Sequence, residues 1–117
     1  VLIQRLFVYG TLRPGESNHY LLESIPGQWY SAHVGGIVHT ISRGRSRGFP
    51  GLQLLEGDER AEGMLLCSDQ LHRHWARLDE FEGACYRRVL TRCWPIDGTE
   101  AAAYVYIATE FLADLQH

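Results

Sequence analysis

The most informative residues for chemistry lie near the end of a predicted helix, in the segment SDQLHRHWARLDEFEG (residues 68–83). The apolar residues Leu71, Trp75 and Leu78 follow the i, i+4, i+7 spacing that places side chains on one face of a helix. The next position on that face, i+11, is Glu82, which lies about 20° from Leu71 around the helix axis. The pattern therefore predicts that the Glu82 carboxylate turns inward.

An inward carboxylate has unusual acid–base properties. Burial disfavours the ionised form, and the negative end of the helix dipole acts in the same direction. Both effects raise the pKa of a glutamate from about 4.3 towards neutrality, where a general base works best. Arg87 or Arg88 could oppose this shift by pairing with Glu82. The spacing also leaves two alternatives open: the helix ends before Glu82, or its side chain binds a backbone amide.

A second candidate site follows the first predicted strand, Ile3–Tyr9, which Gly10 ends. A glycine at this place lets backbone N–H groups turn towards a bound anion. Tyr9 adds an aromatic ring and a hydroxyl. A strand followed by glycine and a turn is also a common structural feature, so this segment alone specifies no function.

Another motif, Gly44-Arg45-Ser46-Arg47-Gly48, matches the GxSxG pattern of serine hydrolases. That pattern needs a helix directly after it, within a large α/β sheet. Here Phe49-Pro50-Gly51 follows, so we reject a serine hydrolase. Arginines of this loop could bind phosphate or nucleic acid, but the net charge of −3 favours a solvated loop and argues against a nucleic-acid partner.

The composition narrows the chemistry further. All eleven basic residues are arginine, which excludes Schiff-base lysines, pyridoxal-phosphate attachment and Walker-type phosphate loops. No histidine or cysteine has metal-ligand spacing, so we expect neither a metal nor a cofactor. No apolar run approaches the roughly 20 residues of a membrane span. Three cysteines without a CxxC pair and no visible signal peptide predict a cytoplasmic protein with reduced thiols.

Several elements must position these candidates. We expect one domain, residues 1–117, of the α+β or mostly β class. The predicted strands are residues 3–9, 28–42, 62–67, 86–94 and 100–107, the last two forming a hairpin. The Gly35-Gly36 pair is expected to split the 28–42 segment at a bulge or bend. Helices are predicted near Ser17, from a Ser68 N-cap to a Gly83 stop, and over residues 109–115, while residues 43–51 are expected to be irregular.

The candidates together resemble the γ-glutamylcyclotransferase-like (AIG2-like) family. The resemblance rests on YGTLR at Tyr9–Arg13 with Asn18 after it, on LDxxEGxxYxR from Leu78 to Arg88, and on a late Tyr104-x-Tyr106 strand. It covers nearly the whole chain, and its length is similar to the short bacterial and γ-glutamylamine cyclotransferase branch. The implied fold is a small, mixed α+β barrel-like sheet of six to seven strands with a few short helices and a cavity at one end.

The resemblance also implies a reaction. In this family the α-amine of a γ-glutamyl group attacks its own γ-carbonyl, which forms 5-oxoproline and releases the attached amine. The glutamate before the glycine of LDxxEG is the general acid/base, and here it is Glu82. The loop residues Tyr9, Gly10, Thr11 and Leu12, together with Tyr86, are expected to bind the glutamyl group.

We therefore predict a γ-glutamyl cyclotransferase-type enzyme acting on a small-molecule γ-glutamyl amine or peptide. The alternative is a non-catalytic member of the same fold that binds a small acid. The sequence leaves open whether the protein is a monomer or a homodimer.

Overall fold

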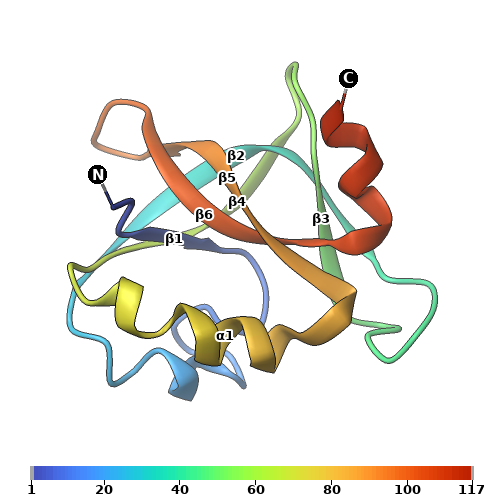
Figure 1. The fold of residues 1–117 in the computed structure, drawn as a ribbon. Helices are drawn as coiled ribbons and strands as arrows, with labels where there is room; N and C mark the ends of the chain where they lie inside the picture. The colour runs from blue at the N-terminus through green and yellow to red at the C-terminus, as the bar shows by residue number, and fades with distance from the viewer. Residues whose placement is uncertain (1, 117) are drawn as a thin grey trace.

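The computed structural model describes residues 2–116, with side chains up to residue 113. The described residues form six strands, one α-helix and four 3₁₀ segments (Figure 1). The strands are β1 (Arg5–Val8), β2 (Gln28–Thr40), β3 (Pro50–Leu54), β4 (Arg60–Cys67), β5 (Tyr86–Pro95) and β6 (Ala101–Ala108). The helix is α1 (Trp75–Glu82), and the 3₁₀ segments are η1 (His19–Leu21), η2 (Leu71–Arg73), η3 (Gly83–Cys85) and η4 (Thr109–Gln116).

The sheet closes on itself as a barrel. Its strand order is β3-β2-β4-β1-β6-β5, and β2 also pairs with β5. Five strands therefore form the closed barrel, while β3 is an additional strand beside β2. Neighbours are antiparallel except β1 and β6, which run parallel. The predicted α+β barrel-like fold is confirmed.

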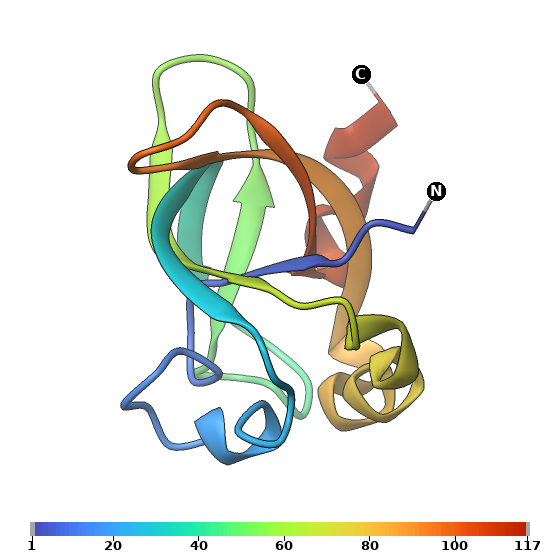
Figure 2. The ribbon, with the colours of Figure 1, turned by 90° about the vertical axis from the view of Figure 1, so that its left-hand side faces the viewer.

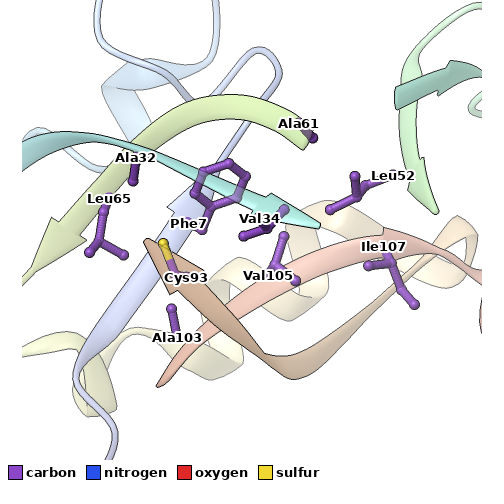
Figure 3. Close-up of a cluster of buried hydrophobic side chains, with 10 residues drawn as sticks. All are labelled: Phe7, Ala32, Val34, Leu52, Ala61, Leu65, Cys93, Ala103, Val105 and Ile107. Carbon is purple, nitrogen blue, oxygen red and sulfur yellow. The ribbon is translucent and has the colours of Figure 1, made fainter. Parts of the chain in front are cut away.

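Alternating side chains give the sheet two cores. In β6, Val105 and Ile107 point into the barrel, while Tyr106 between them packs on the outer face, as the two-residue period of a strand requires. The barrel interior is filled by apolar side chains that converge from all six strands (Figure 3). They are Phe7, Ala32, Val34, Leu52, Ala61, Leu65, Cys93, Ala103, Val105 and Ile107.

The second core attaches α1 to the outside of the barrel. Leu71 and Leu78 are fully buried against Leu6 of β1 and Leu66 of β4. Trp75 packs at the edge of the same cluster. Because β1 is buried on both faces, it forms a rigid support for the loop that follows it.

The predicted helix start is wrong. The sequence favours one helix from Ser68, but α1 begins at Trp75, after the 3₁₀ segment η2. The Ser68 hydroxyl accepts a hydrogen bond from the Gln70 N–H at 3.1 Å, so it caps a turn instead of the helix. The inward face survives this correction, because Trp75 and Glu82 are seven residues apart within α1 and therefore lie about 20° apart around its axis.

Two other predictions about the strands need correction. Residues 43–51 were expected to be irregular, yet Pro50 and Gly51 begin strand β3. The Gly35-Gly36 pair does not interrupt β2. Instead, Gly35 pairs with Arg60 of β4 and Gly36 pairs with Leu54 of β3, so the pair marks the place where β2 changes partners.

The close packing of the barrel can be tested by a substitution at Gly63 of β4. A Cβ at this position would lie 2.3 Å from the Val8 carbonyl oxygen and 2.7 Å from the Phe7 ring. Because a backbone carbonyl cannot move away easily, we expect Gly63→Ala to lower the free energy of unfolding by about 1–3 kcal/mol in urea titrations. Gly98→Ala is the control, since the nearest contact of its Cβ is an ordinary 3.6 Å. Equal stability of the two variants would contradict this packing.

Candidate active site

A cavity of about 190 Å³ lies at the end of the barrel where the β1 loop, the β2–β3 turn and α1 meet. Figure 2 shows these three segments at the same end of the barrel. The cavity is lined by Phe7, Val8, Tyr9, Gly10, Thr11, Leu12, Asn18, Ser46, Phe49, Pro50, Phe81, Glu82, Tyr86 and Tyr106. All six site residues predicted from the sequence line it.

Glu82 is the ionisable residue of α1 that faces this cavity. It is the last residue of the helix, because Gly83 takes a positive φ of 73° that favours glycine and turns the chain away. Burial raises the pKa of the Glu82 carboxyl to about 7. Among the described residues, no side chain or backbone group donates a hydrogen bond to this carboxylate. The helix therefore includes Glu82, and the Glu82 side chain binds no backbone amide among the described residues, so neither alternative left open by the sequence is observed.

Three tyrosines surround Glu82, and all three donate their hydroxyl protons elsewhere. Tyr9 donates to the Tyr106 carbonyl at 2.6 Å, and Tyr86 donates to the Pro50 carbonyl at 2.7 Å. Tyr106 donates to Asp79 Oδ1 at 2.7 Å. Burial is the main cause of a raised pKa in each tyrosine, including about 12 for Tyr86, and the nearby Glu82 charge contributes to all three.

The loop after β1 offers backbone donors. It is closed by a hydrogen bond from the Arg13 N–H to the Gly10 carbonyl and by Asn18, which bonds both the carbonyl and the hydroxyl of Thr11. Leu12 anchors it in the outer core. The N–H groups of Gly10, Thr11 and Leu12 have no acceptor among the described residues. They remain available to a ligand with a carboxylate or carbonyl oxygen.

The opposite wall comes from the turn between β2 and β3. Ser46, Phe49 and Pro50 line the cavity from this side, and no pattern in the sequence assigned them to the site. The Tyr86 hydroxyl holds this wall through its bond to Pro50. Strand β3, not a helix, follows the GxSxG-like segment, in agreement with rejection of a serine hydrolase.

One ion pair beside the site was not predicted correctly. Arg88 does not pair with Glu82; its Nε and Nη2 donate to the two oxygens of Asp79 at 2.9 and 3.2 Å. The Arg88 hydrogen bond is the largest cause of the lowered Asp79 pKa, with a further contribution from Tyr106. Asp79 lies in α1 and Arg88 lies in β5, so helical spacing could not assign this pair.

The described residues contain neither a metal-binding group of side chains nor a helix that could span a membrane. No group of three or more histidine, cysteine or acidic side chains in this part of the chain could hold a metal ion. No described helix is long and apolar enough to cross a membrane.

The family model described as "Gamma-glutamyl cyclotransferase, AIG2-like" matches residues 6–117. The chain belongs to this family. No curated protein matches the sequence significantly. The match to the family model confirms the family resemblance of the YGTLR and LDxxEG segments. These are the two segments that meet at the cavity.

Solved structures show the same family fold. YkqA from Bacillus subtilis is 27% identical with a TM-score of 0.70; the match covers 92% of this chain but 36% of YkqA, so the chain spans about a third of that protein. An AIG2-like protein from Mus musculus is 22% identical (TM-score 0.63, 95% of this chain and 80% of that one). A structure described as gamma-glutamyl cyclotransferase is 17% identical (TM-score 0.63, 90% and 66%).

The raised pKa of Glu82 predicts a pH-dependent stability for this family member. Because the pKa rises from 4.5 to about 7 on folding, the folded state binds more protons between these pH values. The free energy of unfolding should therefore fall as the pH rises through this window, by at most about 3 kcal/mol. Glu82→Gln cannot titrate, so in urea titrations it should lack this decline and exceed the wild type in stability above pH 7.

Glu80→Gln is the matched control, because Glu80 is exposed on the same helix and the variant retains Glu82. It should keep the decline of the wild type. Identical pH dependence in the two variants would show that Glu82 ionises freely in the folded protein.

Proposed function

We propose that this protein is a γ-glutamyl cyclotransferase that releases 5-oxoproline from a small γ-glutamyl amine or peptide, with Glu82 as general acid/base. The observation that carries the proposal is the Glu82 carboxylate, which is half-buried in the cavity, has no hydrogen-bond donor among the described residues and has a pKa of about 7. A base of this strength, opposite a loop with free backbone N–H groups, is what ring closure of a γ-glutamyl group needs.

The first step concerns the nucleophile. The α-amine of a γ-glutamyl compound has a pKa near 8 and is mostly protonated at neutral pH, whereas only the neutral amine can attack. Glu82 takes one proton from the ammonium. The two pKa values differ by about one unit, so this transfer costs only about 1.4 kcal/mol.

The second step forms the ring. The amine nitrogen attacks the γ-carbonyl carbon, and the carbonyl electrons move onto oxygen. The N–H groups of Gly10, Thr11 and Leu12 can bind this developing oxyanion or the α-carboxylate of the substrate. Glu82 then gives its proton to the leaving nitrogen and takes the second proton from the ring nitrogen as the carbonyl re-forms and the carbon–nitrogen bond breaks. 5-Oxoproline is released, and the second proton passes from Glu82 to the released amine, which leaves as an ammonium. Holding both reacting atoms in one molecule contributes several kcal/mol through proximity.

The far side of the cavity faces the leaving amine. Phe49 and Phe81 line it and remain partly exposed, and Ser46 adds one hydroxyl. We infer that substrate preference among γ-glutamyl compounds resides in these three side chains, because the glutamyl end is expected at Glu82 and the Gly10–Leu12 loop.

A binding protein that has lost turnover is the second candidate. Such a protein would bind a small acid through the N–H groups of the Gly10–Leu12 loop. The chain is only 17% identical to the solved gamma-glutamyl cyclotransferase, and a fold can persist at that identity without its activity. Calorimetry with 5-oxoproline and γ-glutamyl amines separates the two, because a binding protein retains the intact γ-glutamyl compound.

The enzyme should release 5-oxoproline from at least one member of a panel of γ-glutamyl amines, γ-glutamyl dipeptides and glutathione, measured by mass spectrometry. Loss of the base should lower kcat/KM of Glu82→Gln by about 10²–10⁴-fold. Glu80→Gln, on the exposed face of α1, should retain wild-type turnover. Full activity in a folded Glu82→Gln protein would refute the assigned role.

A further inference from the structure

The carboxylate of Asp79 lies between the catalytic helix and the barrel. Asp79 is one turn before Glu82 in α1, and positions three apart are neighbours on a helix. Its Oδ1 accepts hydrogen bonds from the Tyr106 hydroxyl at 2.7 Å and the Arg88 Nε at 2.9 Å. The Arg88 guanidinium is itself held over the Trp75 and Tyr104 rings at 4.5 and 4.7 Å.

The hydroxyl that Asp79 holds belongs to one of the three tyrosines that line the cavity together with Glu82. Each neighbouring element contributes one titratable group: Tyr9 at the end of β1, Tyr86 from β5 and Tyr106 from β6. Tyr9 and Tyr86 donate to backbone carbonyls, and these acceptors are present whatever side chains their residues carry. Only Tyr106 depends on an acceptor side chain, so its proton is the one that a single residue directs.

We propose that Asp79 is a positioning residue that holds the Tyr106 hydroxyl proton away from Glu82, so that the Glu82 carboxylate meets the substrate without a protein donor. The inference deepens the proposed function and rests on it, because a donor on Glu82 would compete with the substrate ammonium for the same oxygens. Tyr106 and Glu82 line the same cavity, and the charge of Glu82 makes a small contribution to the raised pKa of Tyr106.

Removal of Asp79 would leave two donors without a carboxylate, the Tyr106 hydroxyl and the Arg88 guanidinium. Both could then turn to Glu82, and each would stabilise its ionised form. The expected consequence is a weaker base. Asp79 also stabilises the attachment of α1 to β5 through Arg88, so a loss of activity alone would not separate positioning from simple support of the fold.

The test is the titration of the Glu82 carboxyl carbon followed by ¹³C NMR. An Arg88→Met background removes the cation from the comparison. In that background, Asp79→Ala should lower the titration midpoint of Glu82 by about one pH unit or more, because the Tyr106 hydroxyl becomes its donor. Adding Tyr106→Phe should return the midpoint to that of the background, because the donor is then gone.

Two results would overturn the proposal. One is an unchanged midpoint after Asp79→Ala, which would leave Asp79 a structural role only. The other is a lowered midpoint that persists with Tyr106→Phe, which would assign the effect to the lost Asp79 charge. If the multiple variants do not fold, Tyr106→Phe alone still tests the premise: the proposal requires its Glu82 midpoint to equal that of the wild type, and a raised midpoint would overturn it by showing that Tyr106 donates to Glu82 in the native protein.

The titration needs no substrate, so it stays readable in a protein that releases no 5-oxoproline. Failure of the positioning role and failure of the cyclotransferase function are therefore separate results.

Discussion

The central constraint in this structure is a carboxylate that must be partly buried and yet receive no hydrogen bond from the described part of the chain. Burial without a donor raises the pKa of Glu82 to about 7. Proteins usually pair such groups, because an unpaired ionised side chain away from water is unfavourable. Here the surrounding hydroxyls are each committed to another acceptor, so the carboxylate faces the cavity alone.

The barrel makes this arrangement rigid. Tyr106 lies on β6 between the inward-facing Val105 and Ile107, so the strand that fills the core also fixes the tyrosine against α1. Tyr9 follows β1, which is buried on both faces, and its hydroxyl joins β6 and β3 by donating to Tyr106 and accepting from Leu52. The polar network around the cavity is therefore held by two hydrophobic cores.

The sequence predicted the parts of the site that depend on local pattern. Helical periodicity placed Glu82 inward, glycine chemistry marked the Gly10 loop and the Gly83 stop, and runs of β-forming residues identified all five barrel strands, with each end within two residues of its observed position. Strand β3 and the Asp79–Arg88 pair could not be found this way, because both depend on partners distant in sequence: β3 pairs with β2, and Arg88 follows Asp79 only after the chain has turned from α1 into β5. The helix start was misplaced for a related reason, since Ser68 can cap a turn as well as a helix.

The same distinction applies to function. The absence of lysine excluded several chemistries, and it places no limit on a reaction that uses a carboxylate and backbone N–H groups. Periodicity and family resemblance both pointed to Glu82, but only the structure shows that its neighbours leave it without a donor. The most direct measurement is a crystal structure of Glu82→Gln with an intact γ-glutamyl amide bound. We expect the substrate α-nitrogen at hydrogen-bond distance, about 2.6–3.2 Å, from the side chain of residue 82, with the glutamyl oxygens on the Gly10–Leu12 N–H groups. A ligand whose α-nitrogen points away from residue 82, or that binds outside this cavity, would contradict it.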